Sequence, residues 1–273
     1  MVEQYFKHFK QRDDLAFDFF YISQEKAVDN AFLENLKENL LISYRALEQY
    51  QFHLREASEE KIKDYVRDYV IPQDISGVDR NVRQGDWGEI LAGLMVSKFQ
   101  DLSIPINKLR WKVNKNKSVF GTDLIAFNNG ETITDIHYYE IKTRLYSHKK
   151  EGAQPHYGYI SILAHNSLLK DNNAPSEMLA DFLMRYYIDR NQFDMAAKFS
   201  DIVQNPSKYN RKFELFFIVE ENKYTDKIFE ELNDLPPQLD PLRVTVIIIK
   251  DLQKLIDDTW SDIELRLVNL IIP

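Results

Sequence analysis

The chain has 273 residues, of which 44% are hydrophobic and none is cysteine. This length can bury a sizeable core in one large domain or two small ones, and the lack of cysteine excludes disulfides and thiolate metal sites. The 35 basic and 43 acidic residues give a formal net charge of −8, which is unusual for a protein that grips nucleic acid by itself. No apolar run approaches the roughly 18 residues of a membrane span, and the first residues contain no apolar signal segment, so we expect a cytoplasmic chain with no membrane partner.

The first 75 residues predict a strand followed by helices. Residues 15–22 (LAFDFFYI) are typical of a strand. Residues 29–50 carry apolar side chains at three-and-four spacing, which predicts a helix, and a second helix is expected over 58–71, where Pro72 ends the pattern. The polar stretch 72–83 is predicted to be a loop. We predict one domain over 1–273, in which 1–75 form an N-terminal strand and helical layer and 80–273 form the core.

A helix is predicted to open at the segment Gly85-Asp86-Trp87-Gly88-Glu89, because apolar residues recur after it at helical spacing. Glu89 would lie in the first turn of this helix. It could close a variant of the capping box with Asp86, or it could serve as an acidic ligand beside a functional site. Ala92 and Gly93, one turn further on, would let another backbone or a ligand come close.

A β-hairpin is predicted next. Residues 119–127 and 133–145 are strand-like runs joined by Asn128-Asn129-Gly130, which is a strong turn signal. Side chains two apart on a strand share a face, so Glu140 and Lys142 should point the same way, partly into solvent, and Ile141 should point into the core. If the hairpin pairs in simple register, Asp123 approaches Glu140. Two carboxylates and a lysine would then converge on one point.

The Glu-x-Lys tripeptide alone carries little information, because it also occurs at Glu59/Lys61 and at Glu221/Lys223. The first of these lies in a helical pattern and the last in a polar turn. Only the middle tripeptide lies in a strand that follows a glycine-led aspartate. The alternative interpretation is an ordinary surface hairpin with an ion pair across its face, which contributes roughly 0.2–1 kcal/mol.

The aspartate of one strand and the Glu-x-Lys of the next resemble the motif of PD-(D/E)XK nucleases. In such sites hard carboxylate oxygens bind Mg²⁺ or Mn²⁺, the metal polarises the scissile phosphate, and a lysine orients or activates the attacking water. The resemblance implies that Asp123 and Glu140 hold the metal, with the Ile141 carbonyl as a third ligand. It assigns Lys142 to the attacking water and Glu89 as an accessory catalytic ligand.

A closer resemblance is carried by the segments RQGDWGEILAGLMVSKF, FGTDLIAF and YYEIKTRL between residues 83 and 145. In a cysteine-free chain of this length they resemble the family of the nuclease subunit of the Hachiman anti-phage defence system (HamA). That family implies magnesium-dependent DNA cleavage and a superfamily 2 helicase subunit (HamB-like) as partner. Related exonucleases carry Gln-x-x-x-Tyr on the next helix, whereas the segment 154–157 (QPHY) has these residue types at the wrong spacing.

The rest of the chain predicts alternating helices and strands. Helices are expected over 157–169, 175–190 and 251–259, and strands over 213–219, 242–249 and, at an edge, 263–267. The unbroken apolarity of 242–249 indicates burial on both faces. We therefore expect an α/β fold with a mixed central β-sheet flanked by helices, in which a restriction-endonuclease-like core carries an N-terminal helical elaboration. A polar, mobile loop is expected over 146–155, and His148, His156 and His165 are expected to face solvent or phosphate, because their spacing fits no tight metal site.

Charge is unevenly spread along the chain. From Arg110 to Lys150, eight basic residues accompany four acidic ones, a local +4 that leaves −12 for the remainder. Because phosphate contacts supply most non-specific affinity, we expect the chain alone to bind DNA weakly. Our interpretation is a metal-dependent DNA nuclease that acts as effector subunit of a helicase-coupled defence complex. The alternatives are a catalytically silent subunit that regulates a helicase, and a stand-alone nuclease of restriction or resolvase type.

Overall fold

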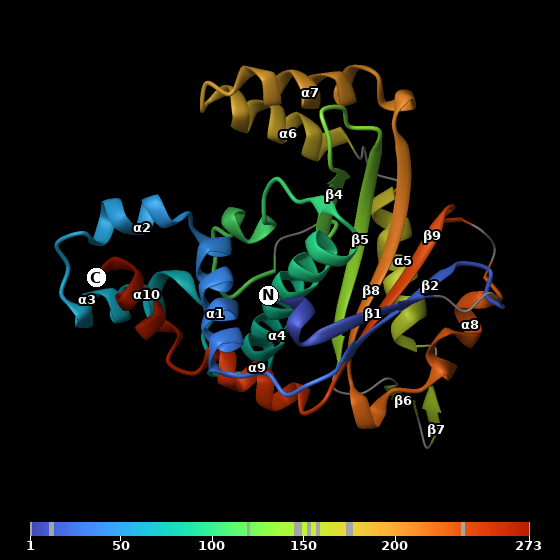
Figure 1. Ribbon diagram of the computed structural model, residues 1–273, viewed down its shortest axis with the longest axis horizontal. Coiled ribbons are helices and arrows are strands. Elements are labelled where there is room, and N and C mark those ends of the chain that lie inside the picture. Colours follow the sequence, from blue (N-terminus) through green and yellow to red (C-terminus); the bar gives the residue numbers. More distant parts are fainter. Residues whose placement is uncertain are drawn as a thin grey trace.

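The computed structural model describes residues 2–10, 14–118, 121–144, 149–151, 154–156, 159–172, 177–235 and 238–272. Within these residues the fold is mixed α/β, with a seven-stranded sheet and ten α-helices (Figure 1). The strand order is β1-β2-β9-β8-β5-β4-β3. The strands are β1 (Phe6–Lys10), β2 (Asp18–Gln24), β3 (Leu102–Ser103), β4 (Leu124–Asn128), β5 (Asp135–Arg144), β8 (Asn210–Glu220) and β9 (Leu242–Ile249).

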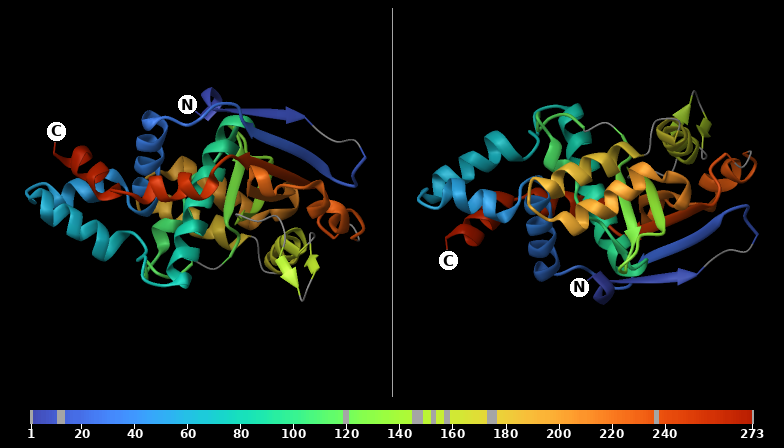
Figure 2. Two further views of the ribbon diagram at one scale, coloured as in Figure 1. Left: turned by 90° about the horizontal axis from the view of Figure 1, so that it is seen from below. Right: turned by 90° about the horizontal axis from the view of Figure 1, so that it is seen from above.

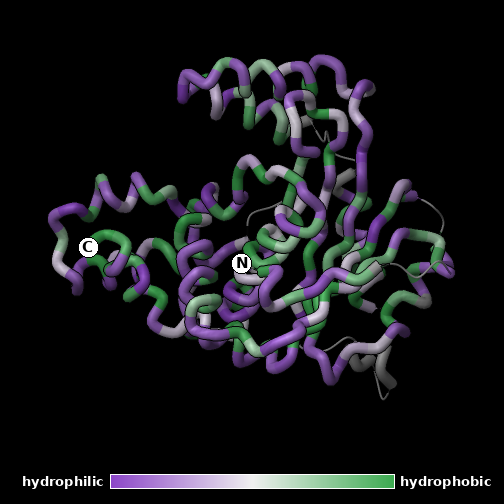
Figure 3. The backbone as a smooth tube through the Cα atoms, in the orientation of Figure 1, coloured by the Kyte–Doolittle hydropathy of each residue, from purple (hydrophilic) through white to green (hydrophobic). Residues whose placement is uncertain are grey.

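The sheet is parallel in its centre and antiparallel at both edges. Strands β2, β9, β8 and β5 pair in parallel, while β1 runs antiparallel to β2, and β4 runs antiparallel to β5 and β3. Side chains of β8 and β9 are buried on both faces, and hydrophobic residues are concentrated in the central strands (Figure 3). The mixed sheet flanked by helices and the strand at 242–249 are therefore confirmed.

Helices cover both faces of the sheet. On one face lie α1 (Asn30–Tyr44), α4 (Gly77–Phe99) and α9 (Leu252–Trp260), whose apolar side chains share a core with Ile141 and Ile218. On the other face α5 (Tyr159–Asn172) packs on β5 and β8, in a second core that contains Tyr138 and Phe217. Helices α6 (Glu177–Ile188) and α7 (Phe193–Gln204) form a hairpin beyond the β4–β5 turn, where β5 begins (Figure 1).

A lobe of helices projects from one end of the molecule, and α2 (Leu47–Leu54), α3 (Glu59–Tyr65) and α10 (Ile263–Ile271) build it (Figures 1 and 2). The predicted edge strand at 263–267 is wrong, because this segment is α10. Ile263 and Leu267 are buried while Leu265 is 41% exposed, which is the spacing of a helical face. The single helix predicted over 29–50 is also divided, since Arg45 is extended between α1 and α2.

Helix α4 begins earlier than predicted, inside the stretch 72–83 that was expected to be a loop. Ser76 and Asp79 form its capping box: Ser76 Oγ accepts from the Asp79 N–H at 3.2 Å, and Asp79 Oδ2 accepts from the Ser76 N–H at 3.0 Å. Glu89 consequently lies in the middle of the helix rather than in its first turn. The alternative that Glu89 closes a capping box is thus excluded.

Helix α4 approaches β5 most closely at Gly88. A Cβ added there would lie 1.8 Å from Thr143 Oγ1, whereas one at Gly93 would meet only Ile104 at an ordinary 3.6 Å. The close approach that was expected near Ala92 and Gly93 therefore falls one turn earlier. It fixes the middle of α4 against the strand that carries Glu140.

The remaining elements agree in part with the predictions. Helices α5 and α6 and the segment Leu252–Trp260 are helical as expected, whereas α7 and β1 were not predicted. Two short antiparallel strands, β6 (Lys149–Glu151) and β7 (Gln154–His156), lie where a loop was expected, and the short α8 (Glu230–Asn233) precedes β9. His148 lies outside the described residues, and His165 on α5 is 3% exposed, so the expectation that it faces solvent or phosphate is wrong. No described helix is long and apolar enough to cross a membrane.

Candidate functional site

The β4–β5 hairpin places Asp123 opposite Glu140. Leu124 pairs with Tyr139, so Asp123, one residue before β4, comes level with Glu140, as the simple register predicted. The backbone N–H of Asp123 donates to the Tyr139 carbonyl at 3.0 Å, and Asp123 Oδ2 accepts from the Ile141 N–H at 2.8 Å. The carboxylate thus replaces the backbone of β4 as the partner of β5 at the point where the ladder ends.

Glu140 and Lys142 share one face of β5, and the Lys142 ammonium forms an ion pair with Glu140 Oε1. Ile141 points the opposite way, into the core beneath α4. Glu140 is only 4% exposed, so the expectation that it faces solvent in part is wrong, whereas it is confirmed for Lys142, whose side chain is 24% exposed. Helix α5 covers this face, and its Ser167 hydroxyl donates to the carboxylate. Burial and then the charge of Asp123 raise the pKa of Glu140, while Lys142 opposes the shift.

Glu89 is linked to this site by Lys108, a residue that was not predicted to belong to it. Lys108, at the start of the 3₁₀ turn Lys108–Trp111, places its Nζ 2.7 Å from Asp123 Oδ1 and 3.3 Å from Glu89 Oε1. Its side chain is 9% exposed. Although burial alone would lower the pKa of Lys108, the Glu89 and Asp123 carboxylates raise it above its ordinary value. The ammonium therefore links the helix acid to the hairpin acid.

A second buried ion pair lies one turn before Glu89 on α4. The Lys112 ammonium and the Tyr44 hydroxyl both donate to Asp86 Oδ2, and the side chains of Lys112 and Asp86 are each 3% exposed. Burial raises the pKa of Asp86, and Lys112 opposes that shift. Burial likewise raises the pKa of Glu89 well above its ordinary value, with Lys108 opposing it and Asp123 and Asp86 adding to it.

The oxygen donors at the hairpin are of the kind that a hard divalent cation prefers. Asp123 and Glu140 offer carboxylates, and the carbonyl of Ile141 points to the same strand edge as its N–H, which binds Asp123. In the described part of the chain, however, no three acidic or histidine side chains are grouped as a metal site. Lys108 and Lys142 are bound to the carboxylates instead. The donor types fit Mg²⁺ or Mn²⁺, and a bound metal would replace contacts that the two lysines make with the carboxylates.

Four of the eight basic residues counted between Arg110 and Lys150 are held by contacts within the protein. Arg110 Nη2 donates to the Ile42 carbonyl at 3.0 Å, Lys115 donates to the Arg67 carbonyl, and Lys112 and Lys142 are paired with acids. The side chains of residues 149 and 150 lie outside the described part of the structure. Much of the local positive charge is therefore paired or hydrogen-bonded within the protein.

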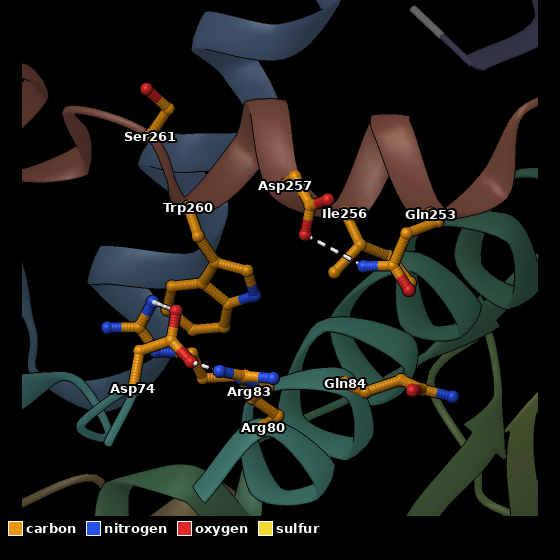
Figure 4. Close-up of a pocket in the computed structure, with 9 residues that line it drawn as sticks. All are labelled: Asp74, Arg80, Arg83, Gln84, Gln253, Ile256, Asp257, Trp260 and Ser261. Carbon is orange, nitrogen blue, oxygen red and sulfur yellow. Dashed lines mark hydrogen bonds and ion pairs between the residues drawn. The ribbon is translucent and has the colours of Figure 1, made fainter. Parts of the chain in front are cut away.

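A cavity of about 560 Å³ lies between α4 and α9, apart from the carboxylates (Figure 4). Its wall carries Arg80 and Arg83, both bound to Asp74, and the Arg83 guanidinium stands 5.3 Å from the centre of the Trp260 ring. Gln84 joins the cavity to the end of β5, because its Nε2 donates to the Thr143 carbonyl at 2.6 Å. No residue predicted for the site lines this cavity.

The fold and the site define a mixed α/β protein with a cluster of carboxylates and lysines at the antiparallel edge of its sheet. The chain belongs to the HamA family, whose model matches residues 3–261. The match runs from the N-terminal strand through α9 and includes every predicted site residue. It confirms the resemblance that the motifs between residues 83 and 145 carried, and it makes the chain a subunit of the Hachiman anti-phage defence system. No curated protein matches the chain.

Proposed function

We propose that this chain is a metal-dependent DNA nuclease with a PD-(D/E)XK core, and that it is the effector subunit of a helicase-coupled Hachiman complex. The observation that carries the proposal is the meeting of Asp123, Glu140 and Lys142 across the β4–β5 hairpin. An ordinary surface hairpin would not bury Glu140 against a covering helix, since an unneeded buried carboxylate costs stability.

In this proposal Asp123, Glu140 and the Ile141 carbonyl hold Mg²⁺ or Mn²⁺, with Glu89 as accessory ligand. A bound divalent cation supplies Lewis-acid polarisation of a phosphate and a more acidic water. The Ile141 N–H fixes one oxygen of Asp123. Lys142, held by Glu140, orients the attacking water and offsets the negative charge that develops on the phosphoryl oxygens.

The scaffold is suited to hold these groups still. Asp123 and Glu140 lie on paired strands, and Gly88 lets α4 press directly on Thr143, one residue beyond Lys142. Helix α5 covers the face that carries Glu140, and the carboxylate is only 4% exposed. A site built on packed strands and helices keeps its geometry better than one built on loops.

The test compares Glu140→Gln and Lys142→Met with wild type in cleavage of supercoiled plasmid, with Mg²⁺ or Mn²⁺. The matched control is Glu221→Gln with Lys223→Met, which alters the same tripeptide on the exposed 3₁₀ turn Glu221–Lys223. We expect each site variant to lose at least about 100-fold in rate while the control keeps it. Circular dichroism and thermal melting establish that the variants are folded. Wild-type rates in both site variants would refute the catalytic assignment.

The helicase partner is tested in the same preparation. The chain is co-expressed with a superfamily 2 helicase subunit of a Hachiman system, the complex is purified, and cleavage is measured with and without ATP and DNA ends. We expect a stable complex whose cleavage depends on the helicase engaging DNA. A complex that never cleaves, but whose helicase activity requires this chain, would establish the silent regulatory subunit instead.

A further inference from the structure

Lys108 has no role in the proposed reaction, yet it makes the central contact of the site. Its ammonium lies within hydrogen-bond distance of Asp123 Oδ1 and within ion-pair distance of Glu89 Oε1. Among the described residues it is the cation that joins the acid of α4 to the acid of the hairpin. Its side chain is almost fully covered, so this is not a surface ion pair of small consequence.

The segment that carries Lys108 is anchored on three sides. Leu109 is 2% exposed, the Arg110 guanidinium donates to the Ile42 carbonyl on α1, and the Trp111 ring lies 4.3 Å from that of Phe182 on α6. The lysine is therefore delivered to the carboxylates by a packed turn rather than by a free loop. Only the side chain of Lys108 is free to move away from Asp123.

We propose that Lys108 is an internal counter-ion that competes with the divalent cation for Asp123, which lowers the metal affinity of the chain. This inference rests on the proposed function. An ammonium and a divalent cation bind the same carboxylate oxygen and repel each other at contact distance. Metal coordination by Asp123 therefore requires Lys108 to leave Oδ1. The ammonium already lies 3.3 Å from Glu89 Oε1, so a short withdrawal from Asp123 is enough, and the other oxygen of Glu89 is left for the metal.

A purely structural lysine makes the opposite prediction. If Lys108 only holds α4 against the hairpin, its removal loosens Asp123 and Glu89, and metal binding weakens or stays the same. If Lys108 competes, its removal strengthens metal binding even though the metal-free protein becomes less stable. Metal affinity, measured apart from cleavage, separates the two.

The first measurement is the affinity of wild type, Lys108→Met and Lys108→Gln for Mn²⁺. Electron paramagnetic resonance of the free ion monitors the binding. The matched control is Lys112→Met, which removes a similarly buried lysine that is paired with Asp86 rather than with a proposed ligand. We expect Mn²⁺ to bind the Lys108 variants at least tenfold more tightly than wild type, and the control to change much less. Equal or weaker binding by folded Lys108 variants, or an equal gain in the control, would overturn the inference.

The second measurement uses the unaltered chain, so that it holds even if the variants fail to fold. Lysines are acetylated briefly with and without Ca²⁺, and each site is quantified by mass spectrometry. We expect Ca²⁺ to increase labelling of Lys108 severalfold, while Lys98, a half-exposed lysine at the end of α4, is labelled equally. If the chain binds the metal but Lys108 is labelled at the same rate or more slowly, this inference is overturned and the proposed function is not. Absence of metal binding in every protein overturns the proposed function together with it.

Discussion

Replacing Gly88 by alanine should push β5 away from α4. The added Cβ would lie 1.8 Å from Thr143 Oγ1 and 3.1 Å from Thr143 Cβ. Contacts of Cβ atoms below 3.0 Å essentially never occur, so helix and strand must separate by about 1.2 Å, or the threonine must turn. A turn of χ1 removes the first clash but not the second, since Thr143 Cβ does not move with that rotation.

The expected cost follows from two opposing terms. Overpacking a well-packed contact costs typically about 1–3 kcal/mol, and replacing glycine by alanine within a helix returns roughly 1 kcal/mol. We expect a net destabilisation of about 1 kcal/mol, or a fall in Tm of roughly 2–4 °C for a chain of this size. The effect on cleavage should be larger, because a shift of about 1 Å in reacting groups can cost roughly 100-fold.

Gly85 provides the control, because it lies in the same helix and a Cβ there has no neighbour within 4 Å. Gly85→Ala should raise Tm slightly and leave cleavage unchanged. Combining Gly88→Ala with Thr143→Ala removes the nearer clash and should recover part of both losses. Thermal melting and plasmid cleavage are measured for all four proteins. If Gly88→Ala is as stable and as active as Gly85→Ala, the close packing of α4 on β5 does not position the site.

Two further predictions concern ions. Cleavage should require Mg²⁺ or Mn²⁺, and Ca²⁺ should support binding without turnover, because every proposed ligand is an oxygen; activity that persists in excess EDTA would contradict this. Burial raises the pKa of Asp86 above its ordinary 3.8 despite Lys112, so the stability that Asp86 contributes is complete below about pH 3.8 and is lost as the pH rises through the folded-state value. Chemical denaturation between about pH 4 and pH 7 should therefore show that the free energy of unfolding of Asp86→Asn increases relative to that of wild type as the pH rises. A constant difference would refute the assignment.

The hairpin was predictable because its signals are local. The apolar alternation of the strands and the turn at Asn128-Asn129-Gly130 act within a few residues, and they place Asp123 level with Glu140. The helix over the C-terminal segment 263–267 was not predictable, since five residues with alternating polarity fit both the two-residue period of a strand and the 3.6-residue period of a helix. Val268, just beyond that window, breaks the alternation, and it is buried in the structure together with Ile263 and Leu267.

The charges of the site were less predictable than its backbone. Lys108 meets Asp123 and Glu89 through the packing of a turn against α1 and α6, and no spacing in the sequence marks such a contact. The faces of β5 follow from alternation, but alternation does not say what covers a face. Glu140 is buried because α5, which begins 19 residues later, crosses it.

Under the proposed function, the use of lysines within the site bears on how the chain would bind DNA. Lys108 and Lys112 neutralise buried acids, and Arg110 is bound to a backbone carbonyl, so these three cations are not available to phosphates in this arrangement. The chain as a whole carries a net charge of −8, which repels a long duplex. Under the proposed function, affinity for DNA must then come largely from the partner. A lysine that holds Asp123 until metal displaces it would add a second restraint, acting on the site itself rather than on access to it.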